Sequence, residues 1–280
     1  MAKGNLYICG TPIGNLKDIT YRALETLEEV DLIAAEDTRR TKKLLNHYDI
    51  KTRLTSYHEH NAKQKKKELT TQLKEGREIA LVSDAGMPGI SDPGYELVKL
   101  AHKENIKVQP IPGPTAMTSA LVASGLPTDE FLFAGFLPRK KERRTYLEKI
   151  KDEPRTMVFY ESSKRIRDTL KDILEILGNR EVALCRELTK KFEQIVSASV
   201  REVIKEFKLN RPKGEITLVV EGGKGSKGKE EWRSLSILDH IKKEMKQGLT
   251  KKEAIKKVAK VRRLPKSEVY KIGTKIRADY

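Results

Sequence analysis

The sequence has very little cysteine and no apolar run long enough to cross a membrane. No stretch of its 280 residues approaches the ~20 apolar residues that a membrane-spanning helix needs. The two cysteines, Cys9 and Cys185, lie in apolar runs typical of strands, so we expect buried free thiols in a reducing cytoplasm. Because no cluster of cysteine and histidine has zinc spacing, no metal site is predicted. The first residues lead straight into a predicted strand, and we expect no signal peptide.

The familiar phosphate-binding fingerprints are also missing. Residues 10–15, Gly-Thr-Pro-Ile-Gly-Asn, match neither the dinucleotide fingerprint nor the P-loop. Gly76-Arg77 lacks the context of a P-loop as well. Nothing in the sequence therefore indicates Mg²⁺–phosphate chemistry.

Acidic residues are outnumbered, and the excess of positive charge is concentrated at one end. The chain has 57 lysines and arginines against 40 acids, a net charge of +17. Charge of this size favours a polyanionic partner, although a surface solvated by lysine is the simpler alternative. Residues 224–280 contain 18 basic and 7 acidic residues, a net of +11. This distribution indicates a localised basic module, which uniform bias would not produce.

The first half of the chain alternates strand-like and helix-like segments. Predicted strands cover residues 5–9, 31–35, 54–57, 79–82 and 108–111. Helices are predicted between them at residues 20–30, 41–48 and 63–75. The theme continues from about residue 119 to residue 220, with strands at 131–135, 156–160, 182–185, 195–199 and 215–220 and helices at 166–177 and 200–209. Repeated strand–helix units favour an α/β fold with a mostly parallel sheet.

Polar loops follow the predicted strands of the first half. They cover residues 10–15, 36–40, 58–61, 84–94 and 113–116. Because the carboxyl ends of parallel strands share one edge of a sheet, we expect these loops to converge on one cleft.

The loop at residues 83–95 is the most informative of these segments. It places three glycines and two prolines around the carboxylates Asp84 and Asp92, and residues 112–116 repeat the design. Such a loop offers bare backbone and fixed turns, although a plain tight turn is the alternative for each loop alone. Two of them after consecutive strands favour a ligand site.

Charged clusters elsewhere admit two interpretations. Residues 36–39, Glu-Asp-Thr-Arg, fit either a helix N-cap or a functional site. His58 and His60 flank Glu59, but a metal site would need a further ligand. The basic runs at 63–67 and 139–144 are either solvated helix faces or extensions of a basic surface.

The basic tail is predicted to be a separate helical module. Residues 221–229 have the composition of a flexible linker. Helices are predicted at 235–246, 250–263 and 267–275, the second opened by the capping-box pattern Thr-Lys-Lys-Glu. The tight turn before the last helix resembles a helix-turn-helix, which favours nucleic-acid binding. A small bundle packed on the main body or on a partner subunit is the alternative.

Together these residues resemble the tetrapyrrole methylase superfamily of S-adenosylmethionine enzymes, in particular its branch acting on ribosomal RNA. The resemblance covers essentially the whole chain. The matching stretches are residues 6–16, 35–39, 56–61, 83–95, 111–120, 133–139, 160–162, 252–254 and 264–266. The wider superfamily has Gly-x-Gly-Pro-Gly in its first loop. The different loop at residues 10–15 argues against a tetrapyrrole substrate and fits the ribosomal RNA branch.

The resemblance implies two α/β domains, at residues 1–117 and 118–223, with the active site in the cleft between them. Residues 224–280 then form a basic linker and a helix-turn-helix-like module. The implied activity is 2′-O-ribose methylation of a cytidine in the decoding region of bacterial 16S rRNA, with S-adenosylmethionine as the methyl donor. The implied substrate is small-subunit rRNA or the 30S subunit, and the enzyme is expected to be a homodimer.

The resemblance also implies roles for individual residues. The expected cofactor-binding residues are Asp84, Gly86, Met87, Ile90, Ser91, Thr115, Ala116, Tyr160, Leu188 and Thr217. The residues expected to face the acceptor are Glu36, Asp37, Arg39, His58 and Glu59. Asp37 or His58 is the expected proton acceptor, and Arg39 is expected to contact a phosphate or ribose.

Two other functions stay open at the level of sequence. One is a methylase of the same fold that acts on a small molecule or a protein side chain, which the charge and the helical tail disfavour. The other is a non-catalytic nucleic-acid-binding regulator, which has no need of the glycine-rich loops.

Overall fold

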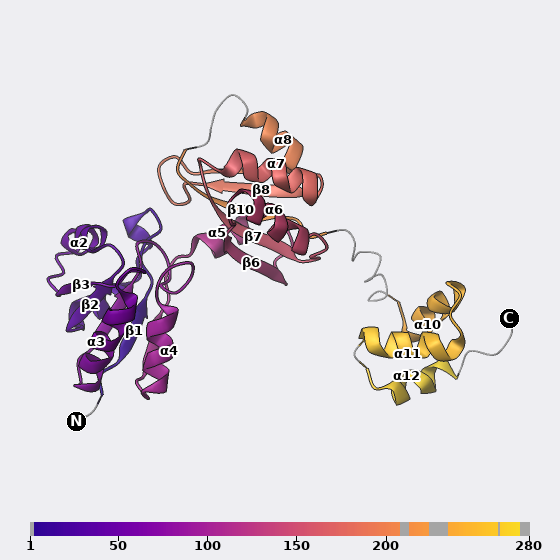
Figure 1. Ribbon diagram of the computed structural model, residues 1–280, viewed down its shortest axis with the longest axis horizontal. Coiled ribbons are helices and arrows are strands. Elements are labelled where there is room, and N and C mark those ends of the chain that lie inside the picture. Colours follow the sequence, from indigo (N-terminus) through magenta and orange to yellow (C-terminus); the bar gives the residue numbers. More distant parts are fainter. Residues whose placement is uncertain (1–2, 208–212, 224–234, 263, 275–280) are drawn as a thin grey trace. The chain divides into compact units, whose positions relative to one another are not determined.

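The structure, a computed structural model, describes residues 3–207, 213–223, 235–262 and 264–274 (Figure 1). The chain divides into two compact units, Met1–Gly222 and Gly223–Tyr280. The predicted linker falls largely outside the described residues, as do the last residues of the predicted helices 200–209, 250–263 and 267–275. The predicted boundary at residue 117 stays a prediction. Within the described parts of the chain, no helix combines the length and apolar character that crossing a membrane requires.

The first sheet is entirely parallel, as its repeated strand–helix units predict. Its strands are ordered β3-β2-β4-β1-β5. They are β1 (Leu6–Cys9), β2 (Leu32–Ala35), β3 (Leu54–Ser56), β4 (Ile79–Val82) and β5 (Val108–Ile111). Every residue of β2 and β4 is buried, because helices cover both faces of the sheet.

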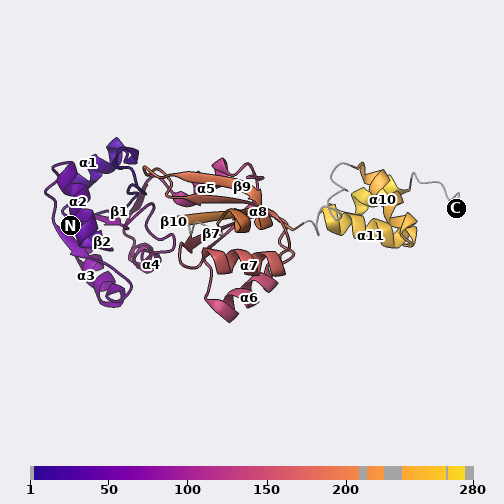
Figure 2. The ribbon, with the colours of Figure 1, turned by 90° about the horizontal axis from the view of Figure 1, so that it is seen from above.

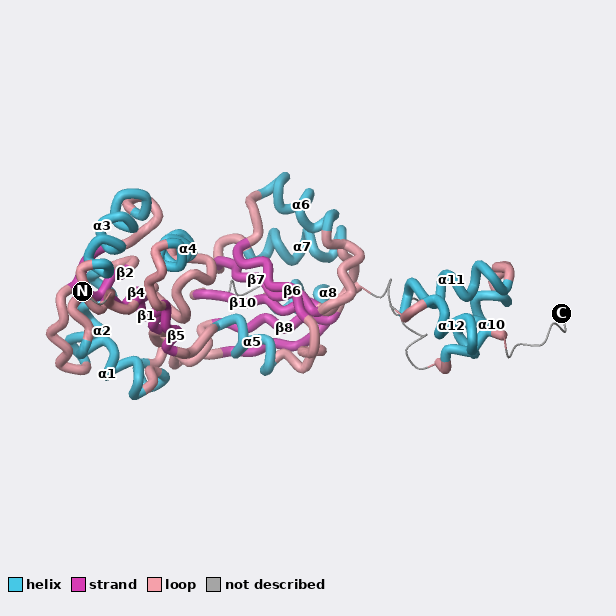
Figure 3. Tube along the Cα trace, turned by 90° about the horizontal axis from the view of Figure 1, so that it is seen from below, coloured by secondary structure: helices cyan, strands magenta, loops and turns pink. Residues whose placement is uncertain are grey.

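The helices of this part lie in pairs on opposite faces of the sheet (Figures 2 and 3). They are α1 (Tyr21–Glu29), α2 (Thr38–His47), α3 (Ala62–Lys74) and α4 (Tyr95–Lys103). Leu27 and Leu45 of α1 and α2 pack with Ile33 of β2. Neighbouring positions of the same strand point the other way, toward α3 and α4, because side chains alternate along a strand. The sequence analysis predicts no helix at α4, and this omission is wrong.

The second sheet is mixed, so the prediction of a mostly parallel sheet is wrong for this half. Its order is β6-β7-β10-β8-β9, and only β6 and β7 are parallel. The strands are β6 (Phe131–Phe136), β7 (Thr156–Ser162), β8 (Glu181–Arg186), β9 (Gln194–Ser199) and β10 (Glu215–Val220). Residues 187–193 are too short for the crossover that parallel neighbours need, so β8 and β9 form an antiparallel pair.

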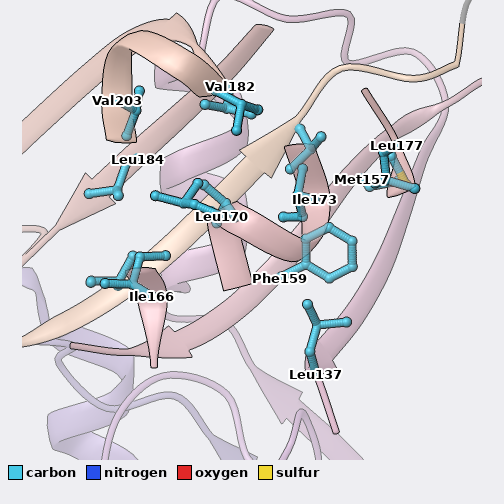
Figure 4. Close-up of a cluster of buried hydrophobic side chains, with 14 of the residues drawn as sticks. Leu137, Met157, Phe159, Ile166, Leu170, Ile173, Leu177, Val182, Leu184 and Val203 are labelled. Atoms are coloured by element: carbon cyan, nitrogen blue, oxygen red, sulfur yellow. The ribbon is translucent and has the colours of Figure 1, made fainter. Parts of the chain in front are cut away.

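Helices also cover this second sheet on both faces (Figure 3). They are α5 (Ala116–Ala123), α6 (Lys140–Lys149), α7 (Ile166–Ile176) and α8 (Val200–Glu206). Leu170 and Ile173 of α7 pack on Phe159 and Leu184 of the sheet in the larger core (Figure 4). α5 packs on the opposite face, where Leu121 meets Val158, Val219 and Cys185.

The second unit is a small three-helix module with a core of its own. Its helices are α10 (Ile237–Lys246), α11 (Lys251–Arg262) and α12 (Lys266–Gly273). The buried core consists of Ile241, Ala254, Ile255, Val258, Ala259 and Val269. The predicted capping box is confirmed, since Glu253 accepts from the Thr250 N–H at 3.0 Å and the Glu253 N–H donates back to Thr250 Oγ1 at 3.4 Å.

Candidate active site

A cavity of about 420 Å³ in the first unit draws its walls from both sheets. The first half of the chain contributes Ile13, Glu36, Arg40, Asp84, Ala85, Gly86, Met87, Ile90, Ser91, Asp92, Thr115 and Ala116. The second half contributes Phe136, Tyr160, Glu161, Ser162, Ser163, Lys164, Cys185, Leu188, Gly214, Glu215, Ile216 and Thr217. Four of the five predicted loops therefore reach this cavity. The loop at residues 58–61 does not line it.

Two glycine-containing loops meet backbone to backbone beside the cavity. A Cβ on Gly10 would lie 2.7 Å from both Gly113 Cα and Met87 Sδ, closer than real Cβ atoms come. Thr11 and Gly86 pair through two backbone hydrogen bonds, at 2.9 and 3.0 Å. Glycine supplies both the close approach and the positive φ of 84° at Gly86. The loops after β1, β4 and β5 are thus held together as one wall.

Asp84 connects the loop after β4 to the end of β2. Its Oδ1 accepts from the Asp37 N–H at 3.0 Å, and Arg40 Nη1 lies 3.3 Å from its Oδ2. The Asp84 N–H donates to Glu36 Oε2 at 3.3 Å. These contacts hold two carboxylates, Asp84 and Glu36, at the cavity wall.

Asp92 is the second aspartate of the glycine-rich loop, and it is half-buried. Its carboxylate accepts a hydrogen bond from the Gly89 N–H. The pKa of Asp92 is raised to about 6, chiefly by burial and also by the negative charges of Glu36 and Asp84, while hydrogen bonds from Gly89 and Ser83 lower it. This carboxylate therefore titrates much closer to neutrality than an ordinary aspartate.

Asp37 and Arg39 lie near the cavity in sequence but do not line it. Asp37 caps α2, accepting from the Arg39 N–H at 2.9 Å and from Arg39 Nη2 at 2.7 Å. The hydrogen bonds from Arg39 hold the pKa of Asp37 well below its usual range. The Arg39 side chain is 87% exposed. Both interpretations of residues 36–39 thus have support, because Glu36 and Arg40 line the cavity while Asp37 is an N-cap.

His58 and Glu59 also lie outside the cavity lining, because β3 is an edge strand of the first sheet. The His58 N–H donates to Asn61 Oδ1 at 2.9 Å, and Asn61 Nδ2 donates to Ser56 Oγ at 3.0 Å, so this loop folds back on itself. His58 Nδ1 is buried without a hydrogen-bond partner among the residues that the structure describes. The rings of His58 and His60 lie 6.0 Å apart. Over the same described residues, no group of three metal-ligating side chains forms.

All ten residues predicted to bind the cofactor line the cavity. They come from both sheets: the loop after β4, the start of α5, and Tyr160, Leu188 and Thr217 of the second half. Geometry brings them together, and their binding role stays a prediction.

The sequence analysis missed several cavity residues of the second sheet. Phe136, at the end of β6, packs its ring 5.5 Å from that of Tyr160 and remains 56% exposed. Cys185 lies in β8, and burial raises the pKa of its thiol to about 11. Glu187 and Thr189 have positive φ values of 50° and 66°, so Leu188 sits between two left-handed residues. Only the mixed strand order brings these positions together. The left-handed backbone at Glu187 and Thr189 is strained, and such strain clusters at functional sites.

Comparison with known proteins places the fold and the sequence among methyltransferases. Residues 5–204 match the family model of tetrapyrrole (corrin/porphyrin) methylases. A protein of Halalkalibacterium halodurans is 55% identical over 273 residues, covering 96% of this chain and 94% of the relative. One of Thermotoga maritima is 55% identical over 219 residues, covering 78% of this chain and 99% of the relative. Both relatives are named ribosomal RNA small subunit methyltransferase I.

A solved structure supports the fold alone. Cobalt precorrin-4 methyltransferase, an enzyme of cobalamin biosynthesis, superposes with a TM-score of 0.60 at 17% identity. The match covers 78% of this chain and 94% of that enzyme. Identity at this level says nothing about a shared substrate.

Proposed function

Since the chain belongs to the tetrapyrrole methylase family and, within it, to ribosomal RNA small subunit methyltransferase I, we propose that it methylates a ribose 2′-hydroxyl of small-subunit rRNA. The proposed acceptor is a cytidine in the decoding region of 16S rRNA, and the proposed donor is S-adenosylmethionine. The observation that carries this proposal is the convergence of all ten expected cofactor positions on one cavity.

The chemistry of the cavity fits the proposed donor. When bound, S-adenosylmethionine supplies an electrophilic methyl group on a cationic sulfur. The carboxylates of Glu36, Asp84 and Asp92 suit a ligand that carries positive charge, and Ile13 and Leu188 suit its apolar surface. The volume of about 420 Å³ falls within the range of small-molecule sites. The bare backbone at Gly86 leaves room that a side chain would fill.

The chain's own contribution to the reaction is chiefly alignment. Holding a hydroxyl in line with an electrophilic carbon converts an encounter between molecules into an internal step. The cofactor-binding set would fix one reactant: Asp84, Gly86, Met87, Ile90, Ser91, Thr115, Ala116, Tyr160, Leu188 and Thr217. Of the residues expected to face the acceptor, Glu36 lines the cavity and is proposed to contact the ribose.

Asp37, Arg39, His58 and Glu59 are proposed to contact RNA beyond the cavity. Asp37 orients the Arg39 guanidinium through two hydrogen bonds, from Nε at 3.0 Å and from Nη2 at 2.7 Å. An exposed, oriented guanidinium suits a phosphate oxygen. The same contacts make Asp37 a weak base, so the expectation that Asp37 accepts the proton loses support. His58 keeps an unpartnered Nδ1 among the described residues but faces no described wall of the cavity.

The second unit is proposed to add affinity for RNA rather than to take part in the chemistry. Lys252, Lys256 and Lys260 are exposed on α11 at intervals of four residues, about 6 Å apart along the helix axis. They lie on the face opposite the buried Ala254, Ile255 and Val258. The Thermotoga relative matches over 99% of its length with only 219 residues, close to the size of the first unit. Methyl transfer therefore need not depend on the basic module.

We also propose that the protein is a homodimer. Apolar surface is left exposed on the first unit by Val122 of α5, by Phe192 just before the edge strand β9 and by Ile195 within β9. Sedimentation should give twice the chain mass of 31.9 kDa. A monomer at the concentration used for activity would overturn this part of the proposal.

The function is tested by methyl transfer from labelled S-adenosylmethionine to 30S subunits and to naked 16S rRNA, with the modified nucleotide mapped. Label on a single ribose of the decoding region is the expected result. Label on a base, on a protein or on tetrapyrrole precursors in a substrate panel would overturn the proposed acceptor. The comparison of subunits with naked rRNA identifies the physiological substrate.

A further inference from the structure

The carboxylates that line the cavity differ in how their charge is balanced. Asp84 lies against Arg40, Glu161 lies 3.3 Å from Arg165, and Glu215 lies 2.9 Å from Lys190. Asp92 has no ion pair with any lysine, arginine or histidine in residues 3–207, 213–223, 235–262 and 264–274. Its charge is met by hydrogen bonds from Gly89 and Ser83. Asp92, like Glu36, is therefore a cavity carboxylate without an ion-pair partner among the described residues.

The loop that carries Asp92 is fixed between the two sheets. Ser91 has a positive φ of 65°, which is strained for a residue with a side chain. A Cβ on Gly135 would lie 2.8 Å from Ser91 Oγ, so Ser91 rests against bare backbone of β6. The register of β6 shifts between Phe133 and Gly135, which marks a bulge at this contact. Bulges and strained residues beside a cavity commonly aim a side chain at a ligand.

Several charged and titratable groups line the same cavity as Asp92. On the first half of the chain they are Glu36, Arg40 and Asp84, and on the second half Tyr160, Glu161, Lys164, Cys185 and Glu215. Burial raises the pKa of Tyr160, the charge of Asp92 contributes to this shift, and both residues line the cavity. Glu36 and Asp84 act on the pKa of Asp92 in the same direction as its burial.

We propose that Asp92 is the catalytic residue that accepts the proton of the ribose 2′-hydroxyl. The proposal rests on the methyl transfer proposed above. The ribose oxygen gives its proton to the Asp92 carboxylate and uses the freed electron pair to bond the methyl carbon. The methyl–sulfur bond breaks with its pair left on sulfur, which becomes a neutral thioether. Asp92 then releases the proton to water.

Asp92 suits this role better than the acceptors expected from sequence. Asp37 is held ionised by Arg39 and lies outside the cavity, and His58 lies outside it too. A general base works best when its pKa lies near the operating pH, and a carboxyl with a pKa of about 6 is mostly ionised yet still basic at neutral pH. Glu36, a second carboxylate of the cavity lining, serves as the comparison.

The test is Asp92→Asn in the full-length protein, with Glu36→Gln as comparison and Asp168→Asn, on the exposed surface of α7, as control. Asparagine keeps an oxygen for the Gly89 N–H but cannot take a proton. We expect kcat to fall about 100-fold or more, in line with the loss of a general base. Calorimetry with S-adenosylmethionine should give an affinity within a few-fold of the wild-type value, since only one of the cavity carboxylates is neutralised, and binding also shows that the variant is folded.

Two pH measurements separate catalysis from structure. In the wild type, kcat/KM should rise with pH through an apparent pKa near 6, and Asp92→Asn should lose this rise while Asp168→Asn keeps it. Carbon-13 NMR of the free protein should show a carboxyl resonance that titrates with a pKa near 6. This resonance should be missing only from the spectrum of Asp92→Asn. Asp92→Glu should recover part of the rate with a shifted profile.

The outcomes that overturn the proposal are distinct. An active wild type with Asp92→Asn equally active, or with an unchanged pH profile, overturns the role of Asp92 alone. A loss of activity confined to Glu36→Gln transfers the role to Glu36. A wild type that methylates no rRNA overturns the proposed function, and the role of Asp92 with it.

Discussion

Asp84 Oδ1 accepts a hydrogen bond from the backbone N–H of Asp37 at 3.0 Å, which joins the glycine-rich loop to the first turn of α2. One carboxylate thus lines the cavity and positions the residue that caps the neighbouring helix. A change at Asp84 is therefore expected to reach both the proposed cofactor site and the proposed RNA contacts.

Asp84→Ala should lower the affinity for S-adenosylmethionine by about 10-fold or more. The variant removes a charged acceptor, and hydrogen bonds to charged groups contribute about 1.5–3 kcal/mol. Asp84→Asn, which keeps the acceptor for the Asp37 N–H, should lose less. Calorimetry measures both affinities. Unchanged affinity in both variants would remove Asp84 from the cofactor site.

Asp37→Ser should lower turnover on 30S subunits while sparing cofactor affinity. Serine keeps the N-cap of α2, so the variant removes the contact with Arg39 without uncapping the helix. Asp37→Ala also removes the cap and should cost about 1 kcal/mol of stability. Steady-state kinetics and thermal unfolding separate the two effects. Full activity of Asp37→Ser would reject a role in acceptor binding.

Asp92 should make the free energy of unfolding fall as the pH rises through the acid range. The pKa of this carboxyl is about 3.9 in the unfolded chain and about 6 in the folded protein. Between these values the folded protein binds more protons than the unfolded chain, so raising the pH favours unfolding. Asp92→Asn should therefore have a higher Tm than the wild type above about pH 6, with the difference gone below about pH 4.

Calorimetric melting across this range checks the prediction, with Asp168→Asn as the control. Equal Tm differences at both ends of the range would show that Asp92 titrates normally. Stability gained by removing a carboxylate at neutral pH is the mark of a group retained for activity.

The triple variant Lys252→Gln, Lys256→Gln, Lys260→Gln should bind RNA more weakly and with less dependence on salt. Each phosphate that the variant no longer neutralises should reduce the slope of log K against log salt by about 0.7–0.9. The matched control is Lys103→Gln, Lys107→Gln, Lys149→Gln, three exposed lysines of the first unit. Electrophoretic mobility shifts at several salt concentrations measure the slopes. Equal slopes in both triple variants would assign the RNA contacts elsewhere.

Removing residues 224–280 should raise KM for 30S subunits and leave kcat and cofactor affinity near their wild-type values. A tethered second binding site raises the effective concentration of the substrate without touching the reacting groups. The buried residues of α10–α12 pack among themselves, so the deletion removes this hydrophobic core as a whole. A collapse of kcat would show that the module has another task.

The residues that sequence could place are those whose role depends on contiguous backbone. Gly86, Met87 and Ser91 follow a buried strand in one glycine-rich segment, and all three line the cavity. Phe136 and Glu215 carry no such signal, because they meet the cavity only through the mixed strand order of the second sheet. Adjacency to a strand end can also mislead. Asp37 follows β2 closely, yet capping α2 turns its side chain to Arg39.

The helix α4 escapes the sequence analysis for a related reason. Its first residue, Tyr95, reads as the end of the glycine-rich loop, although Leu97 and Ala101 are buried at helical spacing. The wrong prediction for the second sheet comes from extending the strand–helix rhythm of the first half. The direction of a strand depends on the length and path of its connections, so it cannot be predicted from the strand propensity of its residues.

The contact between Gly10 and Gly113 has a consequence for how this protein can vary. Because a methyl group on either one would collide with the backbone of the other, no change at one position makes room for a side chain at its partner. A side chain introduced at one of these two positions therefore cannot be compensated by a substitution at the other. In a library randomised at both positions and selected for activity, glycine should return at each of them, independently of what surrounds it.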